Sequence, residues 1–241
     1  MRRAAPWNAP RRAAVLSPLL LAAGCRLTGF YLDNPENPMG DVRRIAVLPI
    51  SSPGSADPMK LGDLLAGELV QFPGVEVVRP GETLAEARKN ALALTDERSV
   101  RALGRLVGAD AVLIAELTEY NPYYPQRVAV AAQLFFMRTP PSDARSAIDL
   151  SAAGRARPVT RLDRCDLLQI EKVYDGSQRE TRDLAAYYAR GHYLGGEAID
   201  GADRVLRLPE FYFRFVSNRL VRDLFADYQA RTAVAKGELK A

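Results

Sequence analysis

The chain has 241 residues, of which 48% are hydrophobic, and this is enough for a globular domain with a sizeable core. Its net charge of +4 comes from 33 basic and 29 acidic residues, but residues 1–24 contain four arginines and no acidic residue. Without that segment the chain carries 29 residues of each sign and has no net charge. Proteins that bind nucleic acid need a surplus of positive charge on one face, so this balance argues against a nucleic-acid partner.

The first residues have the pattern of an export signal. Arginines near the start precede an apolar run of about ten residues, which is too short to span a membrane and ends in small residues before Cys25. The segment LAAGC, residues 21–25, resembles the lipobox of bacterial lipoproteins, although Ala22 stands where leucine is usual. The resemblance implies that residues 1–24 are removed and that Cys25 carries acyl chains, palmitate among them. A plain signal peptide or a short buried N-terminal helix is the alternative.

Acylation of Cys25 would attach the protein to a membrane of the cell envelope. Arg26 follows the cysteine where aspartate would favour the inner membrane, so the sorting rule of proteobacterial lipoproteins, applied by resemblance, favours the outer membrane facing the periplasm. The other cysteine, Cys165, would then have no partner within the chain, which predicts a protein without an internal disulfide.

The rest of the chain is predicted to form one domain. Residues 25–41 comprise the lipidated cysteine and a flexible tether rich in Pro, Asn and Gly, 42–230 the domain, and 231–241 a frayed tail. Hydrophobic spacing predicts elements in the order strand 43–50, helix 58–72, strand 75–78, helices 82–94 and 97–107, strands 111–119, 127–138 and 167–174, and helices 177–190 and 208–228. Residues 139–160 are predicted as an irregular excursion, and four glycines between 191 and 201 as a loop.

This β-α-β-α-β-β start predicts an α/β (α+β) fold, with a mixed central sheet, helices packed on it and extra C-terminal helices. The last helix places Phe213, Val216, Leu220 and Leu224 on one stripe. We expect this stripe to pack in the core, and an oligomer interface is the alternative.

Three segments, RRIAVLPI, VEVVRPGE and VRALGRLVGADAVLIAELTEY, resemble a domain of known envelope proteins. It is shared by the curli-secretion lipoprotein CsgG, the penicillin-binding-protein activator LpoB and the N-terminal domain of TolB, and the likeness covers residues 43–138. It implies a fold and a role in binding or assembly, and it transfers no catalytic residue. A secretion channel would need transmembrane hairpins, but the only suitable strand, 127–138, loses its alternation at Phe135-Phe136, so we predict no pore.

The sequence offers little catalytic chemistry. It has no P-loop, GxGxxG, GxSxG or HExxH motif. One imidazole, His192, and one thiol outside the lipobox cannot make a zinc site, and we interpret His192 as a loop or helix-end residue. We therefore predict no catalytic residue, no metal and no cofactor.

The segment 120–125 is the best candidate contact site. Tyr120, Tyr123 and Tyr124 share it with two prolines, and stiff aromatic side chains are typical of protein interfaces. The alternative is that the rings fold back over the edge of the sheet. The favoured hypothesis is a lipid-anchored, noncatalytic scaffold or regulator of an envelope assembly or synthesis machine, acting on a protein partner. A homo-oligomeric subunit of a secretion apparatus and an envelope-polymer hydrolase remain the two alternatives.

Overall fold

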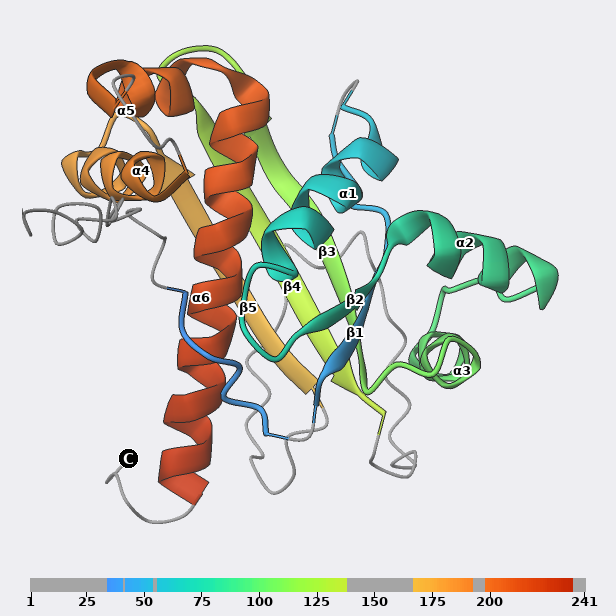
Figure 1. The fold of residues 1–241 in the computed structure, drawn as a ribbon. Coiled ribbons are helices and arrows are strands. Elements are labelled where there is room, and N and C mark those ends of the chain that lie inside the picture. Colours follow the sequence, from blue (N-terminus) through green and yellow to red (C-terminus); the bar gives the residue numbers. More distant parts are fainter. Residues whose placement is uncertain (1–33, 41, 54–55, 138–166, 193–197, 236–241) are drawn as a thin grey trace, which may run out of the picture.

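The structure is a computed structural model, which describes residues 34–40, 42–53, 56–137, 167–192 and 198–235. The elements in chain order are β1 (Arg44–Val47), α1 (Pro58–Leu69), β2 (Glu76–Val78), α2 (Pro80–Lys89), α3 (Glu97–Leu106), β3 (Ala111–Asn121), β4 (Arg127–Phe136), β5 (Leu167–Asp175), α4 (Arg179–His192), α5 (Ala198–Arg207) and α6 (Pro209–Ala235). The strands form one sheet in the order β2-β1-β3-β4-β5 (Figure 1). The predicted fold, a mixed sheet with a β-α-β-α-β-β start and extra C-terminal helices, is confirmed.

The sheet combines a parallel and an antiparallel half. β1 is parallel to both neighbours, with Ile45 opposite Val77 of β2 and Ala111 of β3. Parallel strands need a long crossover connection: α1 connects β1 to β2, and α2 and α3 lead the chain from β2 past β1 to β3. β3, β4 and β5 are antiparallel, and a bulge shifts the register of β3 between Leu117 and Glu119.

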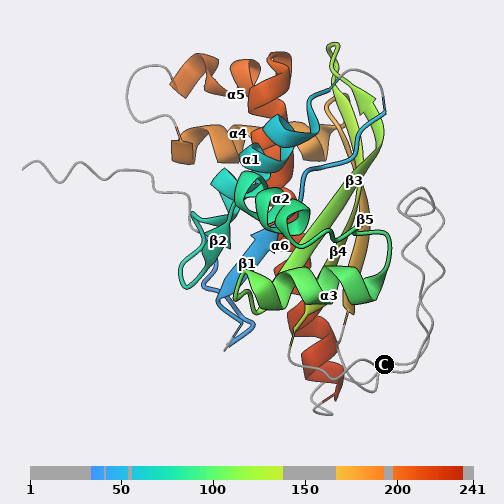
Figure 2. The same cartoon turned by 90° about the vertical axis from the view of Figure 1, so that its right-hand side faces the viewer.

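Hydrophobic cores lie on both faces of the sheet. α1, α4, α5 and α6 cover one face, and α2 and α3 cover the other (Figures 1 and 2). Successive residues of β1 point to opposite cores, with Ile45 and Val47 in the first and Ala46 in the second. A strand that is buried on both faces carries an uninterrupted apolar run, which is why β1 is recognisable in the sequence.

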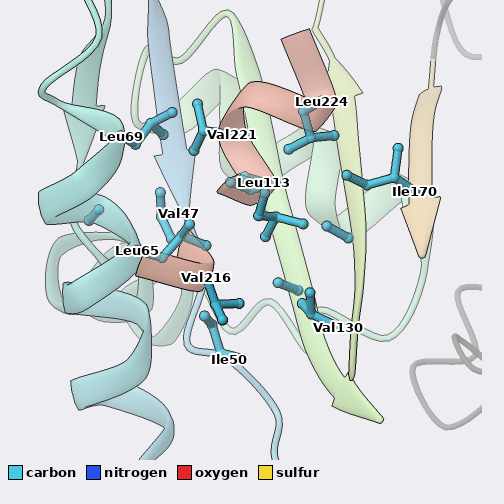
Figure 3. Packing of buried hydrophobic residues seen from close by; sticks show 14 of the residues in the cluster. Val47, Ile50, Leu65, Leu69, Leu113, Val130, Ile170, Val216, Val221 and Leu224 are labelled. Atoms are coloured by element: carbon cyan, nitrogen blue, oxygen red, sulfur yellow. The ribbon is translucent and has the colours of Figure 1, made fainter. Parts of the chain in front are cut away.

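The long helix α6 provides much of the first core. Its 27 residues extend for about 40 Å along the sheet. Phe213, Val216, Leu220 and Leu224 are all buried there, which confirms core packing for the predicted stripe. Figure 3 shows Val216 and Leu224 in this packing beside Leu113 of β3.

Side-chain caps fix the starts of two helices. Asp57 Oδ1 accepts a hydrogen bond from the Met59 amide at 2.9 Å, with Pro58 in the first turn of α1 as predicted. At α3, Asp96 and Ser99 form a capping box, in which the Ser99 amide donates to Asp96 Oδ1 at 2.7 Å. This backbone hydrogen bond is the main cause that holds the pKa of Asp96 below its usual value.

The structure corrects the glycine-rich loop predicted between α4 and α6 at two of its four glycines, and Gly195 and Gly196 lie outside the described residues. Gly191 lies within α4, and Gly201 lies buried within α5, a helix that the sequence did not predict. Glycine lowers helix propensity by about 1 kcal/mol, so it indicated a break. Burial of Val205 and Leu206 of α5 in the first core outweighs that propensity. α6 also continues to Ala235, into the tail that was predicted to fray.

The prediction of a flexible tether over residues 25–41 is also wrong for residues 34–40. Residues 34–40 pack on the domain, with Met39 almost fully buried in the first core. The backbone amide of Asn37 donates to the Pro73 carbonyl at 3.0 Å. Cys25, Cys165 and the predicted excursion 139–160 lie outside the described residues.

Candidate partner-binding surface

The three predicted tyrosines lie at and beside the tip of the β3–β4 hairpin. Tyr123 and Tyr124 are 79% and 56% exposed, and they do not fold back over the sheet. The Tyr123 amide donates to Asn121 Oδ1 at 3.1 Å, which closes a tight turn at the end of β3. Tyr120 differs, because its ring is half-buried against the first core. The tip therefore presents two aromatic rings to solvent, and the third lies at its base.

Arginines from α5 line the same surface. The Arg207 guanidinium lies 5.4 Å from the centre of the Tyr124 ring, and Asp203 holds it through a 2.7 Å ion pair. Arg204 lies 4.8 Å from the centre of the Phe211 ring at the start of α6. These cation–π contacts bring the end of α5 next to the hairpin tip. The sequence did not predict this neighbourhood, because it did not predict α5.

A groove lies between α1 and α6 at the base of the hairpin. Its volume is about 170 Å³, and its lining residues are Ala56, Asp57, Lys60, Leu61, Leu64, Tyr120, Pro209, Glu210 and Phe213. Most of these side chains are apolar, and Lys60 Nζ pairs with Glu210 Oε2 at 3.0 Å. The hydrogen bond from Lys60 is the main cause that lowers the pKa of Glu210. Burial raises the pKa of Tyr120, and the charge of Lys60 opposes that effect.

A wider hollow continues along α1 from this groove. Its volume is about 630 Å³, and it shares Asp57, Lys60 and Leu64 with the groove. Arg79 and Arg214 add positive charge to its lining, and Asp63 adds negative charge. We call the two hollows together the α1–α6 groove.

A second group of polar residues is buried between α1, α4 and α6. Glu68 of α1 has a side chain that is only 1% exposed. Its Oε1 accepts a hydrogen bond from the Tyr188 hydroxyl at 2.8 Å, and its Oε2 lies 3.5 Å from His192 Nε2 and 3.5 Å from Asn218 Nδ2. The rings of Tyr188 and His192 stack with their centres 3.9 Å apart. We call Glu68, Tyr188, His192 and Asn218 the Glu68 cluster.

Sequence reasoning missed the Glu68 cluster because its members lie far apart in the chain and match no motif. The one available signal was Glu68 itself, an acidic residue between Leu65 and Leu69 on the apolar side of a predicted helix. The Glu68 carboxyl group is almost fully buried, and its oxygens face Tyr188, His192 and Asn218. The cluster is therefore suited to joining three helices by hydrogen bonds. His192, the last residue of α4, stands at a helix end.

Within the described residues, no group of three or more His, Cys, Asp or Glu side chains could hold a metal ion. In the same part of the chain, no helix combines the length and the apolar character needed to cross a membrane.

Comparisons with known proteins give only distant likenesses. Neither a protein-family model nor a curated protein matches the sequence. The fold is similar to lipoprotein GNA1162 from Neisseria meningitidis, with 22% identity over 40% of this chain and 74% of that one and a TM-score of 0.32. It is also similar to the LpoB C-terminal domain from Salmonella enterica, with 17% identity over 41% of this chain and 74% of that one and a TM-score of 0.34. The hypothetical protein CT253 from Chlamydia trachomatis has 12% identity over 79% of this chain and 95% of that one, with a TM-score of 0.32.

LpoB, one of these three structural neighbours, is also one of the envelope proteins that the sequence resembles. Scores and identities this low assign the chain to no family, and they leave its function to be argued from its own residues.

Proposed function

We propose that this protein is a lipid-anchored lipoprotein of the bacterial envelope that acts noncatalytically, as a scaffold or regulator of an envelope assembly or synthesis machine. Its anchor would be the acyl chains on Cys25, and the outer membrane facing the periplasm is its expected location, since Arg26 follows the cysteine. The observation that carries the proposed binding role is the exposure of Tyr123 and Tyr124 at a hairpin tip beside an open groove.

The chemistry of this surface supports a protein partner. Tyrosine has a large, stiff and amphipathic side chain, so it loses little conformational entropy when a partner covers it. Arg207 already lies over the ring of Tyr124, and tyrosine and arginine are the residue types that contribute most often to interface hot spots. A partner that rests on the tip could place an apolar side chain in the α1–α6 groove beside Tyr120.

The hot-spot role is tested by placing a photo-cross-linking amino acid at Tyr123 in cells. The matched control position is Tyr187, a tyrosine on α4 that is 46% exposed. We expect an adduct to an envelope protein from position 123 that is absent from position 187, identified by mass spectrometry. Identical adducts from both positions, or none from position 123, would refute binding through the hairpin tip. Adducts that contain only this protein would favour the homo-oligomeric alternative.

Affinity gives an independent measurement once the partner is identified. Truncation of a hot-spot tyrosine costs about 2 kcal/mol or more, so Tyr123→Ala should weaken binding by about thirtyfold or more. The midpoint of thermal unfolding should not change, because the ring is exposed.

The lipid anchor has its own test. Cys25→Ser should abolish incorporation of a fatty-acid probe and release the protein from membranes. Persistent labelling of this variant would show that Cys25 is not the acylated residue.

A further inference from the structure

The chain segment that precedes the domain is fastened to it at two points. We call residues 34–40 the strap. At its centre, the backbone amide of Asn37 donates to the Pro73 carbonyl at 3.0 Å, and the side-chain Nδ2 of Asn37 donates to the Val42 carbonyl at 2.6 Å. Asn37 Oδ1 in turn accepts from the Met39 amide at 3.0 Å. The Met39 side chain is almost fully buried in the first core, so this half of the strap is part of the fold.

The start of the strap is fastened at Asn34. Its Oδ1 accepts a hydrogen bond from Arg222 Nη2 at 2.8 Å, and Asn218 Nδ2 lies 3.4 Å from the same oxygen. Asn34 Nδ2 donates to the Gln71 carbonyl at 3.3 Å, just beyond the end of α1. Asn218 also belongs to the Glu68 cluster, so the strap is connected to the hydrogen bonds that join α1, α4 and α6.

This fastening brings the first point of attachment to the domain closer in sequence to the acylated residue. Asn34 is nine residues after Cys25, and an extended chain of that length spans at most about 30 Å. If the strap were detached, the first attached residue would be Arg44 at the start of β1, and an extended chain from Cys25 to it spans at most about 65 Å. The strap therefore halves the reach of the anchor.

We infer that the strap holds the folded domain close to the lipid surface that carries its acyl chains. The inference rests on the proposed acylation of Cys25. A compact domain of this size has a diameter of roughly 43 Å. Added to the tether of about 30 Å, this puts every point of the domain within about 70 Å of the leaflet. The chain enters the domain at the surface beside Asn34 and Gln71.

The test measures energy transfer from a tryptophan in the domain to an acceptor on lipid headgroups. The single tryptophan, Trp7, precedes Cys25, so the acylated mature protein contains none. Val70→Trp supplies a donor at a position that is 52% exposed and adjacent to Gln71. The protein is purified with its acyl chains and incorporated into phosphatidylcholine vesicles that contain a small fraction of dansyl-labelled lipid.

Two changes should lower the transfer. The first inserts about ten Gly and Ser residues after Gly29, which lengthens the chain directly. The second, Asn37→Ala combined with Met39→Asp, detaches the strap, because a buried aspartate without a partner is unfavourable. We expect each change to lower the transfer at least twofold. Asn90→Ala, at the exposed end of α2, is the matched control and should leave it unchanged.

The outcomes separate the two proposals. If wild-type protein incorporates no fatty-acid probe, the proposed anchor fails. If it is acylated, and the insertion lowers the transfer while detachment of the strap does not, the anchor stands and the inference is wrong. Amide hydrogen exchange provides a check that needs no variant: the amides of Asn37 and Val42 should exchange slowly in the acylated protein. Exchange at the rate of an unstructured peptide would also overturn the inference.

Discussion

The hydroxyl group of Tyr188 allows a direct test of the Glu68 cluster. It donates to Glu68 Oε1 at 2.8 Å in a site from which solvent is excluded. A buried polar group that loses its partner destabilises a protein by about 1–3 kcal/mol. The change Tyr188→Phe removes this donor and keeps the ring, which stacks on His192 and contacts the edge of Phe215. We therefore expect the free energy of unfolding to fall by about 2 kcal/mol.

Thermal unfolding, followed by circular dichroism, measures this effect. For a protein of this size, a loss of 2 kcal/mol lowers the unfolding midpoint by about 4–8 °C. Tyr187→Phe is the matched control, because Tyr187 is the preceding residue of α4 and is largely exposed. Its free energy of unfolding should stay within about 0.5 kcal/mol of wild type. Equal losses in the two variants would refute the reasoning, since the hydrogen bond to Glu68 would then not be their source.

Other changes test the helix caps and the packing. The pKa of Asp96 lies below its usual value of 3.8, and a depressed pKa adds stability that is lost as the pH falls. The stability advantage of wild type over Asp96→Asn should therefore shrink in urea unfolding below pH 3.8, and an advantage that grew there would contradict the cap. Gly104→Ala would place a Cβ against Met137 Sδ and 2.9 Å from Val112 Cγ2, so we expect a loss of about 1–3 kcal/mol. In contrast, Gly67→Ala in α1 meets no atom within 4 Å and should gain up to about 1 kcal/mol; the same sign for both glycine variants in denaturant unfolding would refute the packing argument.

The strands of the sheet could be predicted because their apolar runs reflect how they are buried in the fold. Alternation fails at Phe135-Phe136, and the structure gives the cause: Phe136 lies in the first core and Phe135 in the second. Helices cover both faces of β4 there, so both positions are apolar. α5 was missed because Gly201 indicated a loop, although Ala202, Val205 and Leu206 recur at helical spacing.

The candidate surface could be predicted only in part. The tyrosine-rich turn was visible because aromatic residues and prolines gather within one short segment. The groove and the arginine beside Tyr124 required α1, α5 and α6 to be placed next to the hairpin. The strap resembled a linker because Asn, Pro and Gly are common in loops. The Asn37 side-chain amide donates to the carbonyl groups of Val42 and Gly74, and the sequence does not show where these carbonyl groups lie.

The bulge in β3 determines which side chain faces the groove. Glu119 pairs with Ala129, and Tyr120 pairs with Val128, whose side chain lies in the first core. If the pairing continued from Leu117 without the bulge, Glu119 would stand opposite Val128 and Tyr120 would move to the other face of the sheet. The groove would then be lined by a carboxylate in place of an aromatic ring. One additional residue in a strand, with no change of side chain, therefore sets whether this surface attracts apolar groups or cations.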